Sequence, residues 1–138
     1  MTKISVINYL GNLRTASRHL QSGEEYITDA PTDNQGKGEA FSPTDLVSTG
    51  LGNCMITLMG IAANGNNIPL GEIKAEVQKI MANNPRRIQE IVINFEIEDQ
   101  NFTPKQKAII EYAALNCPVA KSLSPDVQQT VSFNYFLK

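Results

Sequence analysis

Apolar and polar positions in the first thirty residues form three extended segments, which are typical of β-strands. Glycine-containing turn pairs, Gly11-Asn12 and Ser22-Gly23, separate these segments. We therefore predict a three-stranded β-meander at the start of the chain. Its strands are expected at Lys3–Leu10, Arg14–Leu20 and Glu25–Asp29.

A loop and a long apolar helix are predicted next. Residues 30–39 are rich in loop formers and have no apolar periodicity, so a surface loop is expected there. Ser42 then precedes Pro43, with Asp45 in the following turn, and this order is typical of a helix start. The helix is expected to run to about Ala63. Because its apolar residues lie almost all round, we expect it to be central.

The second half of the chain predicts a β-hairpin, two further helices and a final strand. The element order is therefore βββ-α-ββ-αα-β, which is an α+β fold class. With 138 residues, the chain is expected to form a single domain, residues 1–138. The expected bounds are Gly71–Met81 and Arg87–Asp99 for the hairpin, Pro104 to about Leu115 and Pro118 to about Leu123 for the helices, and 131–137 for the strand.

Charge and composition exclude several kinds of partner. Twelve Lys and Arg residues oppose 14 Asp and Glu residues, so the net charge of -2 and the pI near 5.4 disfavour nucleic acid. The chain has no segment like a signal peptide, and no run approaches membrane-spanning length, so we expect a cytoplasmic protein without a membrane partner. With only one histidine, His19, and no CxxC pair, a metal site is the weakest use of its two cysteines.

Cys54 is predicted near the middle of the long helix, where its neighbours are unusual. Gly50 and Gly52 each weaken a helix interior by roughly 1 kcal/mol relative to alanine. Two explanations are open: close packing of the helix against another backbone, or room over the thiol for a substrate or a second cysteine.

Cys117 is predicted where the second helix ends and the short third helix begins. A thiolate there would face free backbone N–H groups and the positive end of a helix dipole, which lower a thiol pKa. The residue is therefore a candidate leaving thiol or second nucleophile, and the alternative is an unreactive helix cap. Spacing alone does not show that Cys117 contacts Cys54.

If Cys54 reacts with peroxide, a nearby cation would favour its thiolate and stabilise the departing hydroxide. Arg14 is the best candidate because it directly follows a turn, and Arg18 shares its strand face as a reserve. Asp45 or Glu39 could orient the arginine. Asp45 lies roughly 13 Å and half a turn from Cys54 along the same helix, so it needs a bridging arginine or a second subunit to act there.

Two segments carry a resemblance that covers essentially the whole chain. They are Ser42-Pro43-Thr44-Asp45-Leu46 leading to Leu51-Gly52-Asn53-Cys54, and Asn116-Cys117-Pro118-Val119-Ala120-Lys121-Ser122-Leu123. A proline-opened helix with a cysteine, followed later by CPVxKxL, resembles the OsmC/Ohr family of hydroperoxide reductases. The resemblance implies an OsmC-like fold and an intertwined homodimer, in which two central helices pack between curved sheets and the active sites lie at the subunit interface.

The resemblance also implies roles for individual residues. Cys54 would be the peroxidatic cysteine and Cys117 the resolving one, with Arg14 matching the family arginine. A hydroperoxide would be the substrate, an unidentified cellular dithiol the reductant, and no metal or organic cofactor is required. The chain departs from the organic-hydroperoxide branch at Thr44, where that branch has glutamate, and Asp45 follows one place later.

Three hypotheses follow from these residues. The first is a thiol peroxidase that forms a Cys54–Cys117 disulfide. The second is a redox-sensing or small-molecule-binding protein with the same fold and slow turnover, which the loss of the expected glutamate favours. In the third, both cysteines are inert core residues.

Overall fold

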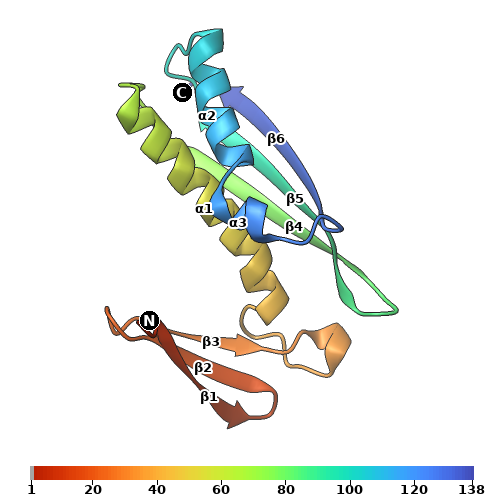
Figure 1. Cartoon of the computed structure of the whole chain (residues 1–138). Helices are drawn as coiled ribbons and strands as arrows, with labels where there is room; N and C mark the ends of the chain where they lie inside the picture. The colour runs from red at the N-terminus through yellow and green to blue at the C-terminus, as the bar shows by residue number, and fades with distance from the viewer. Residues whose placement is uncertain (1) are drawn as a thin grey trace. The chain divides into compact units, whose positions relative to one another are not determined.

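The computed structural model describes residues 2–138, and the chain divides into two compact units, Met1–Val47 and Ser48–Lys138. The order of strands and α-helices is the predicted βββ-α-ββ-αα-β (Figure 1). A short 3-10 helix, η1 (Thr32–Asn34), adds to it within the predicted loop. The single domain stays a prediction, and the two units are described separately.

The first unit is built on an antiparallel sheet in the order β1-β2-β3. Strands β1 and β2 meet at the predicted turn, where Gly11, Asn12 and Leu13 all have positive φ angles, of 85°, 54° and 64°. Glycine adopts this conformation without steric cost, which explains its place at the start of the turn. The strands are β1 (Ser5–Gly11), β2 (Arg14–His19) and β3 (Glu25–Asp29).

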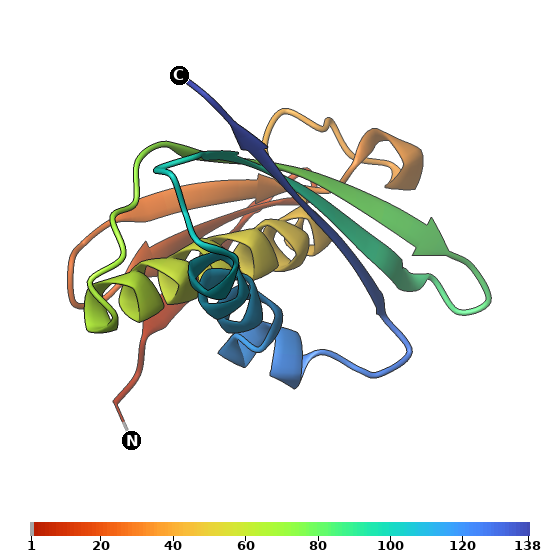
Figure 2. The same cartoon turned by 90° about the horizontal axis from the view of Figure 1, so that it is seen from above.

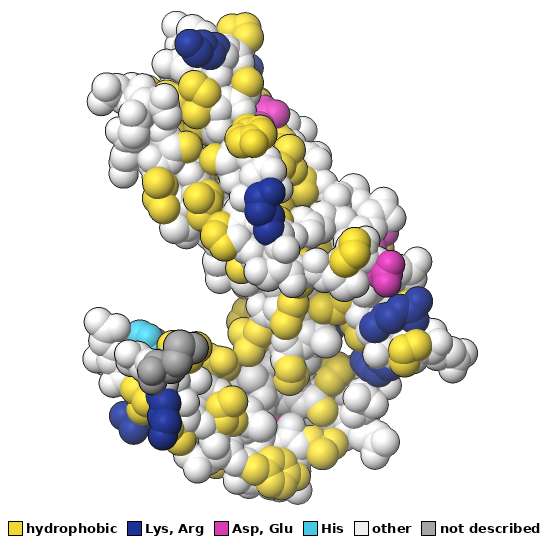
Figure 3. Space-filling view, viewed as in Figure 1, with side chains coloured by type: hydrophobic (Ala, Val, Ile, Leu, Met, Phe, Trp, Pro, Cys, Tyr) yellow, Lys and Arg dark blue, Asp and Glu magenta, His cyan; other side chains and the backbone are white. Residues whose placement is uncertain are grey.

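The first unit buries polar side chains and exposes apolar ones, which is the reverse of an ordinary hydrophobic core. No apolar side chain among residues 2–47 is buried, and the four buried residues of this range are all polar: Ser17, Thr28, Asp29 and Ser42. Hydrophobic side chains are spread over the visible surface (Figure 3). The large exposed apolar residues of this range are Ile4, Val6, Ile7, Tyr9, Leu10, Leu13, Tyr26, Ile27, Phe41 and Val47.

Helix α1 (Pro43–Gly65) begins as the sequence predicts. The Ser42 hydroxyl accepts a hydrogen bond from the Asp45 backbone N–H at 3.0 Å, and the Asp45 carboxylate accepts one from the Ser42 N–H at 3.0 Å. This reciprocal pair satisfies N–H groups that a helix start leaves unpaired, and Pro43 supplies a suitable φ angle for the first helical residue.

The second unit is a three-stranded sheet with its helices on one face (Figures 1 and 2). The predicted hairpin of β4 and β5 is antiparallel, and β6 returns parallel to β5 after the two C-terminal helices, which gives the order β4-β5-β6. The elements are β4 (Ile73–Ala82), β5 (Arg87–Glu98), α2 (Pro104–Leu115), α3 (Pro118–Ser122) and β6 (Gln128–Phe136).

The hydrophobic core lies within the second unit and uses one face of α1. Alternate residues of β5 point into it because side chains of a strand alternate between faces. The apolar residues of α1 that join them recur at helical spacing, as an amphipathic helix requires. The fully buried members from these two elements are Leu51, Met55, Met59 and Ala63 of α1 and Ile91, Ile93, Phe95 and Ile97 of β5.

Helix α1 corrects two expectations. Its predicted central position holds for one face only, because Val47 and Ile61 are exposed. The expectation that no run approaches membrane-spanning length was wrong, because α1 has 23 residues and a mean hydropathy of 1.5 over its most apolar window. A third of that window is buried within the protein. The helix therefore resembles a membrane span by its length and composition only.

Candidate functional site

Cys117 caps helix α3, as the sequence predicts. Its backbone is extended, its Sγ accepts a hydrogen bond from the Ala120 N–H at 3.4 Å, and Pro118 follows as the first helical residue. The residue is fully buried in the core of the second unit. The cap therefore places a thiol, rather than the usual hydroxyl or carboxylate, at the start of this short helix.

The expected low pKa of Cys117 was wrong. Burial is the largest influence and raises its pKa, because the charged thiolate is disfavoured away from water. The N–H groups of Ala120 and Val119 oppose this shift, and the neighbouring Cys54 thiol adds to it. The pKa lies above the ordinary thiol value as a result, so Cys117 is a protonated thiol near neutral pH.

Cys54 and Cys117 lie together in the second unit. Both are free thiols, and the Cys54 side chain lies close enough to Cys117 to raise the pKa of the Cys117 thiol. Cys54 is partly exposed, whereas Cys117 is buried behind it. The structure thereby makes the two cysteines neighbours in one hydrophobic cluster, with one partly exposed thiol and one buried thiol.

The two glycines beside Cys54 have different explanations. A Cβ atom at Gly52 would lie 3.3 Å from the Val77 Cγ2 and 3.8 Å from the Ile93 Cδ1, so close packing of α1 on the sheet accounts for this glycine. A Cβ atom at Gly50 would meet nothing within 4 Å. Packing therefore explains only one of the pair.

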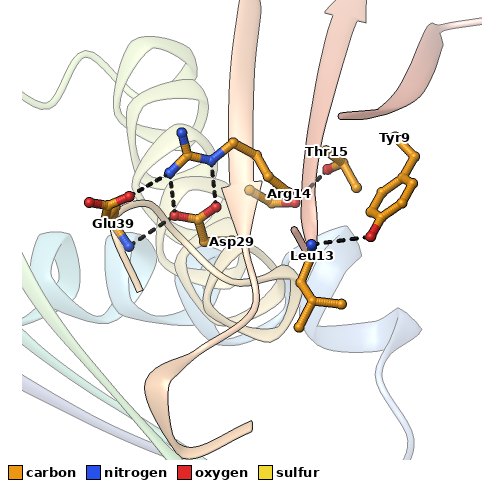
Figure 4. A network of polar contacts seen from close by, with 7 residues as sticks. Tyr9, Leu13, Arg14, Thr15, Asp29 and Glu39 are labelled. Atoms are coloured by element: carbon orange, nitrogen blue, oxygen red, sulfur yellow. Dashed lines mark hydrogen bonds and ion pairs between the residues drawn. The ribbon is translucent and has the colours of Figure 1, made fainter. Parts of the chain in front are cut away.

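Arg14 anchors a polar network in the first unit (Figure 4). Its Nε donates to the Asp29 Oδ1 at 2.7 Å, and its Nη2 donates to the Asp29 Oδ2 at 2.8 Å. The same Nη2 also donates to the Glu39 Oε1 at 2.9 Å, and the Glu39 backbone N–H donates to the Asp29 Oδ2 at 3.0 Å. The arginine therefore makes a two-point contact with one carboxylate and a single contact with another.

The two carboxylates differ in burial. The Asp29 side chain is 2% exposed, the Arg14 side chain 29% and the Glu39 side chain 63%. Hydrogen bonds from Arg14 hold the pKa of Asp29 below its ordinary value, and the same contacts raise the pKa of Arg14. Both members of this inner pair are charged near neutral pH.

The predicted polar residues are only partly placed as expected. Glu39 pairs with Arg14, as one alternative proposed, whereas the Asp45 carboxylate binds the Ser42 N–H at the start of α1. Arg18 is exposed on β2, which leaves Arg14 as the networked arginine. Sequence reasoning missed Asp29. The predicted meander could have indicated this residue. A turn between β2 and β3 sets the first residue of β2, Arg14, opposite the last residue of β3, Asp29.

Residues 2–138 contain no gathering of three or more His, Cys, Asp or Glu side chains that could hold a metal ion. Two small surface hollows are confined to the first unit. One has a cavity volume of about 270 Å³ and is lined by Leu10, Gly11, Asn12, Arg14 and Lys37. The networked arginine is thus accessible to a small molecule from that side.

The fold and the paired cysteines define an α+β protein with a central helix that carries a thiol. A family model described as OsmC-like protein matches residues 36–132, and the chain belongs to that family. A structure from Psychrobacter arcticus, provisionally assigned as an osmotic-stress-induced and detoxification response protein, is 48% identical, with 97% of each chain covered and a TM-score of 0.91.

More distant structures share the fold. An organic hydroperoxide resistance protein OsmC from Legionella pneumophila is 14% identical, with 97% of this chain and 98% of the other covered and a TM-score of 0.76. An OsmC-like protein from Mycoplasma pneumoniae is 19% identical, with 98% and 99% covered and a TM-score of 0.77. The comparison with curated proteins finds no match.

Proposed function

We propose that this chain is a thiol peroxidase that reduces organic hydroperoxides or hydrogen peroxide through a Cys54–Cys117 disulfide. The observation that carries the proposal is the proximity of the only two cysteines of the chain, one partly exposed and one buried. Membership of a family that includes organic hydroperoxide resistance proteins supports it. We expect the reaction to take place in the cytoplasm, where cellular reductants keep thiols reduced.

The reaction has two covalent steps. The Cys54 thiolate attacks an oxygen of the hydroperoxide, an S–O bond forms, the O–O bond breaks, and the alkoxide leaves as an alcohol after taking up a proton. Cys54 is then a sulfenic acid. The Cys117 sulfur attacks the Cys54 sulfur, so that an S–S bond forms and the oxygen leaves as water. A cellular dithiol supplies two electrons to reduce the disulfide and is itself oxidised.

The raised pKa of Cys117 suits the second step better than the first. A protonated, buried thiol is a poor first nucleophile, so peroxide is expected to react at the partly exposed Cys54. Cys117 can lose its proton once Cys54 is a sulfenic acid, because the oxygen that leaves as water takes a proton. Burial therefore assigns Cys54 to the first step and Cys117 to the second.

Arg14 is the cation that we propose for the peroxide step. Its two carboxylate contacts keep it charged and limit its orientation, as an electrostatic stabiliser requires. Asp29 and Glu39 are its carboxylate partners within the first unit, and the role expected of Asp45 stays a prediction.

We also propose that the working form is a homodimer. Large apolar side chains are exposed on the sheet of the first unit and on the outer face of α1, including Ile7, Tyr9 and Ile61. Exposed apolar side chains of this size are typical of an interface. A second copy of the chain would cover both surfaces and turn α1 into the central helix that its composition predicts.

The test is stopped-flow reaction of the reduced protein with cumene hydroperoxide and with hydrogen peroxide, followed by thiol loss. Wild-type protein is expected to lose two thiols per chain, in agreement with one disulfide. Cys54→Ser should abolish this loss, and Cys117→Ser should stop at a sulfenic acid that a dimedone probe captures. Thiols that persist in a large excess of peroxide would overturn the proposal.

The second candidate is a redox-sensing or small-molecule-binding protein with little turnover. The observation that favours it is Thr44 directly after the proline, together with the engagement of Asp45 at the helix start. A single rapid oxidation that a dithiol reverses only slowly would support this candidate over the peroxidase.

A further inference from the structure

Asp29 is the one buried carboxylate among residues 2–47, and its side-chain hydrogen bonds all lie within the arginine network. It lies at the end of β3, where the strand register sets it directly opposite Arg14 at the start of β2. Its two oxygens accept from Nε and Nη2 of Arg14, and Oδ2 also accepts from the Glu39 N–H. The geometry of two strands thus fixes both partners of this pair.

Glu39 has a different relation to the same guanidinium. It follows the loop after β3, its side chain is mostly exposed, and it shares Nη2 with Asp29 through a single hydrogen bond. A single exposed contact of this kind contributes little, because solvent screens it and side-chain entropy opposes it. Glu39 can leave Arg14 without disturbing the Nε contact.

The remaining nitrogen of Arg14, Nη1, has no hydrogen-bond partner among residues 2–138, and Figure 4 shows it pointing away from both carboxylates. Arg14 also lines the small hollow beside the β1–β2 turn. A guanidinium held along one edge by a carboxylate keeps its other donors in a fixed direction.

We propose that Asp29 is the positioning residue for Arg14 in the peroxide reaction: it fixes the Nε and Nη2 edge so that Nη1 remains free to donate to a hydroperoxide oxygen. Glu39 is the exchangeable partner. This inference rests on the proposed function for the reaction that it serves, whereas the Arg14–Asp29 clamp itself can be measured without turnover.

Substitutions of Asp29 and Glu39 should have different effects on the NMR signal of Arg14, because only Asp29 accepts a hydrogen bond from Nε. In ¹⁵N-labelled full-length protein, the Arg14 Nε–H should give a resolved, slowly exchanging signal, which Arg14→Lys assigns. Asp29→Asn should remove the slow exchange, and Glu39→Gln should retain it. Glu25→Gln, which removes an exposed carboxylate from the same strand, is the matched control and should retain it as well.

The reaction gives the second readout. Asp29→Asn should lower the rate constant for oxidation of Cys54 by cumene hydroperoxide about 10- to 100-fold, as misplacement of a catalytic partner does. Glu39→Gln should lower it less than about threefold, and Glu25→Gln should leave it unchanged. Equal effects of the Asp29 and Glu39 substitutions on both readouts would overturn the division of roles.

Asp29→Glu covers the case in which Asp29→Asn does not fold. It retains the charge but moves the carboxylate by one methylene, so the Nε–H signal should persist while the rate constant falls. A wild-type rate constant in a folded Asp29→Glu protein would overturn the positioning role. If wild-type protein fails to react with peroxide, the proposed function fails, and the Nε–H signals still decide whether Asp29 holds Arg14.

Discussion

The two units of this chain are stabilised in opposite ways. The second unit buries apolar side chains between helices and a sheet, whereas the buried side chains among residues 2–47 are all polar and its large apolar ones face solvent. The second unit therefore has a core of its own. The sheet of the first unit relies on hydrogen bonds and on the Arg14–Asp29 pair, and it leaves apolar surface for a partner to cover.

This difference matches the chemistry proposed for each unit. The cysteines must meet with little freedom to form a disulfide, and a packed core supplies that restraint. The arginine must stay charged and reach a small polar molecule, and a partly exposed ionic clamp supplies that condition. The predictions below test the contrast from the largest expected effect to the smallest.

Removal of core volume from the second unit should have the largest effect on stability. Phe95 is fully buried and stacks on Phe133 with ring centroids 5.3 Å apart. Phe95→Ala should lower the free energy of unfolding by about 3–5 kcal/mol. Urea unfolding followed by circular dichroism measures the loss, and a change below about 1 kcal/mol would contradict the assignment of this core.

A charge on the apolar sheet of the first unit should instead act on association. Ile7 is 64% exposed on β1, so Ile7→Asp removes no buried contact within a single chain. If a second copy covers this sheet, the substitution should weaken the homodimer at least about tenfold, which corresponds to about 1.4 kcal/mol. Sedimentation measures the dissociation constant. An unchanged dimer would mean that this sheet is not the covered surface.

The two glycines of α1 provide a matched pair with effects of about 1 kcal/mol. Gly50→Ala should raise the free energy of unfolding by roughly 0.5–1 kcal/mol, since alanine favours a helix and the new methyl group meets nothing within 4 Å. Gly52→Ala gains the same helix propensity but presses on Val77, so it should be neutral or destabilising by up to about 2 kcal/mol. Thermal unfolding of both variants tests the prediction, which fails if Gly52→Ala stabilises as much as Gly50→Ala.

High pH should produce the smallest and most gradual change. The pKa of Cys117 is raised in the folded protein, so the native state keeps a proton that the unfolded chain releases first. Its contribution to stability is complete below the ordinary thiol pKa of about 8.5 and is lost as pH rises through the folded value. The pKa of Tyr135 is also raised, chiefly by burial, so the loss should continue at higher pH. The pH dependence of urea unfolding, compared between wild type and Cys117→Ala, should be shallower in the variant between about pH 8 and 10.

Local patterns predicted the elements well because their signals lie within a few residues of each other. The prolines at 43, 104 and 118 each open a helix as predicted, turn residues separated the first three strands, and alternation marked the later ones. The parallel return of β6 beside β5 and the exposed face of α1 depend on contacts between distant parts of the chain, which no local pattern contains.

The candidate site shows the same limit. Arg14 and both cysteines were recognisable from turns, caps and the family segments. Asp29 was missed because its role depends on strand register, and the pKa of Cys117 was misjudged because a helix cap is a local feature whereas burial is not. Desolvation outweighs the N–H groups of the cap, and only the packed structure reveals that balance.

The central claim is that Cys54 and Cys117 form one disulfide within a chain when peroxide reacts. The most direct measurement is mass spectrometry of peptides from reduced protein treated with one equivalent of cumene hydroperoxide and then alkylated, on a mixture of ¹⁴N- and ¹⁵N-labelled chains. The account predicts a Cys54–Cys117 cross-link between peptides of the same isotope in nearly all of the protein. Oxidation of Cys54 to sulfinic acid with Cys117 alkylated as a free thiol, or cross-links of mixed isotope, would contradict it.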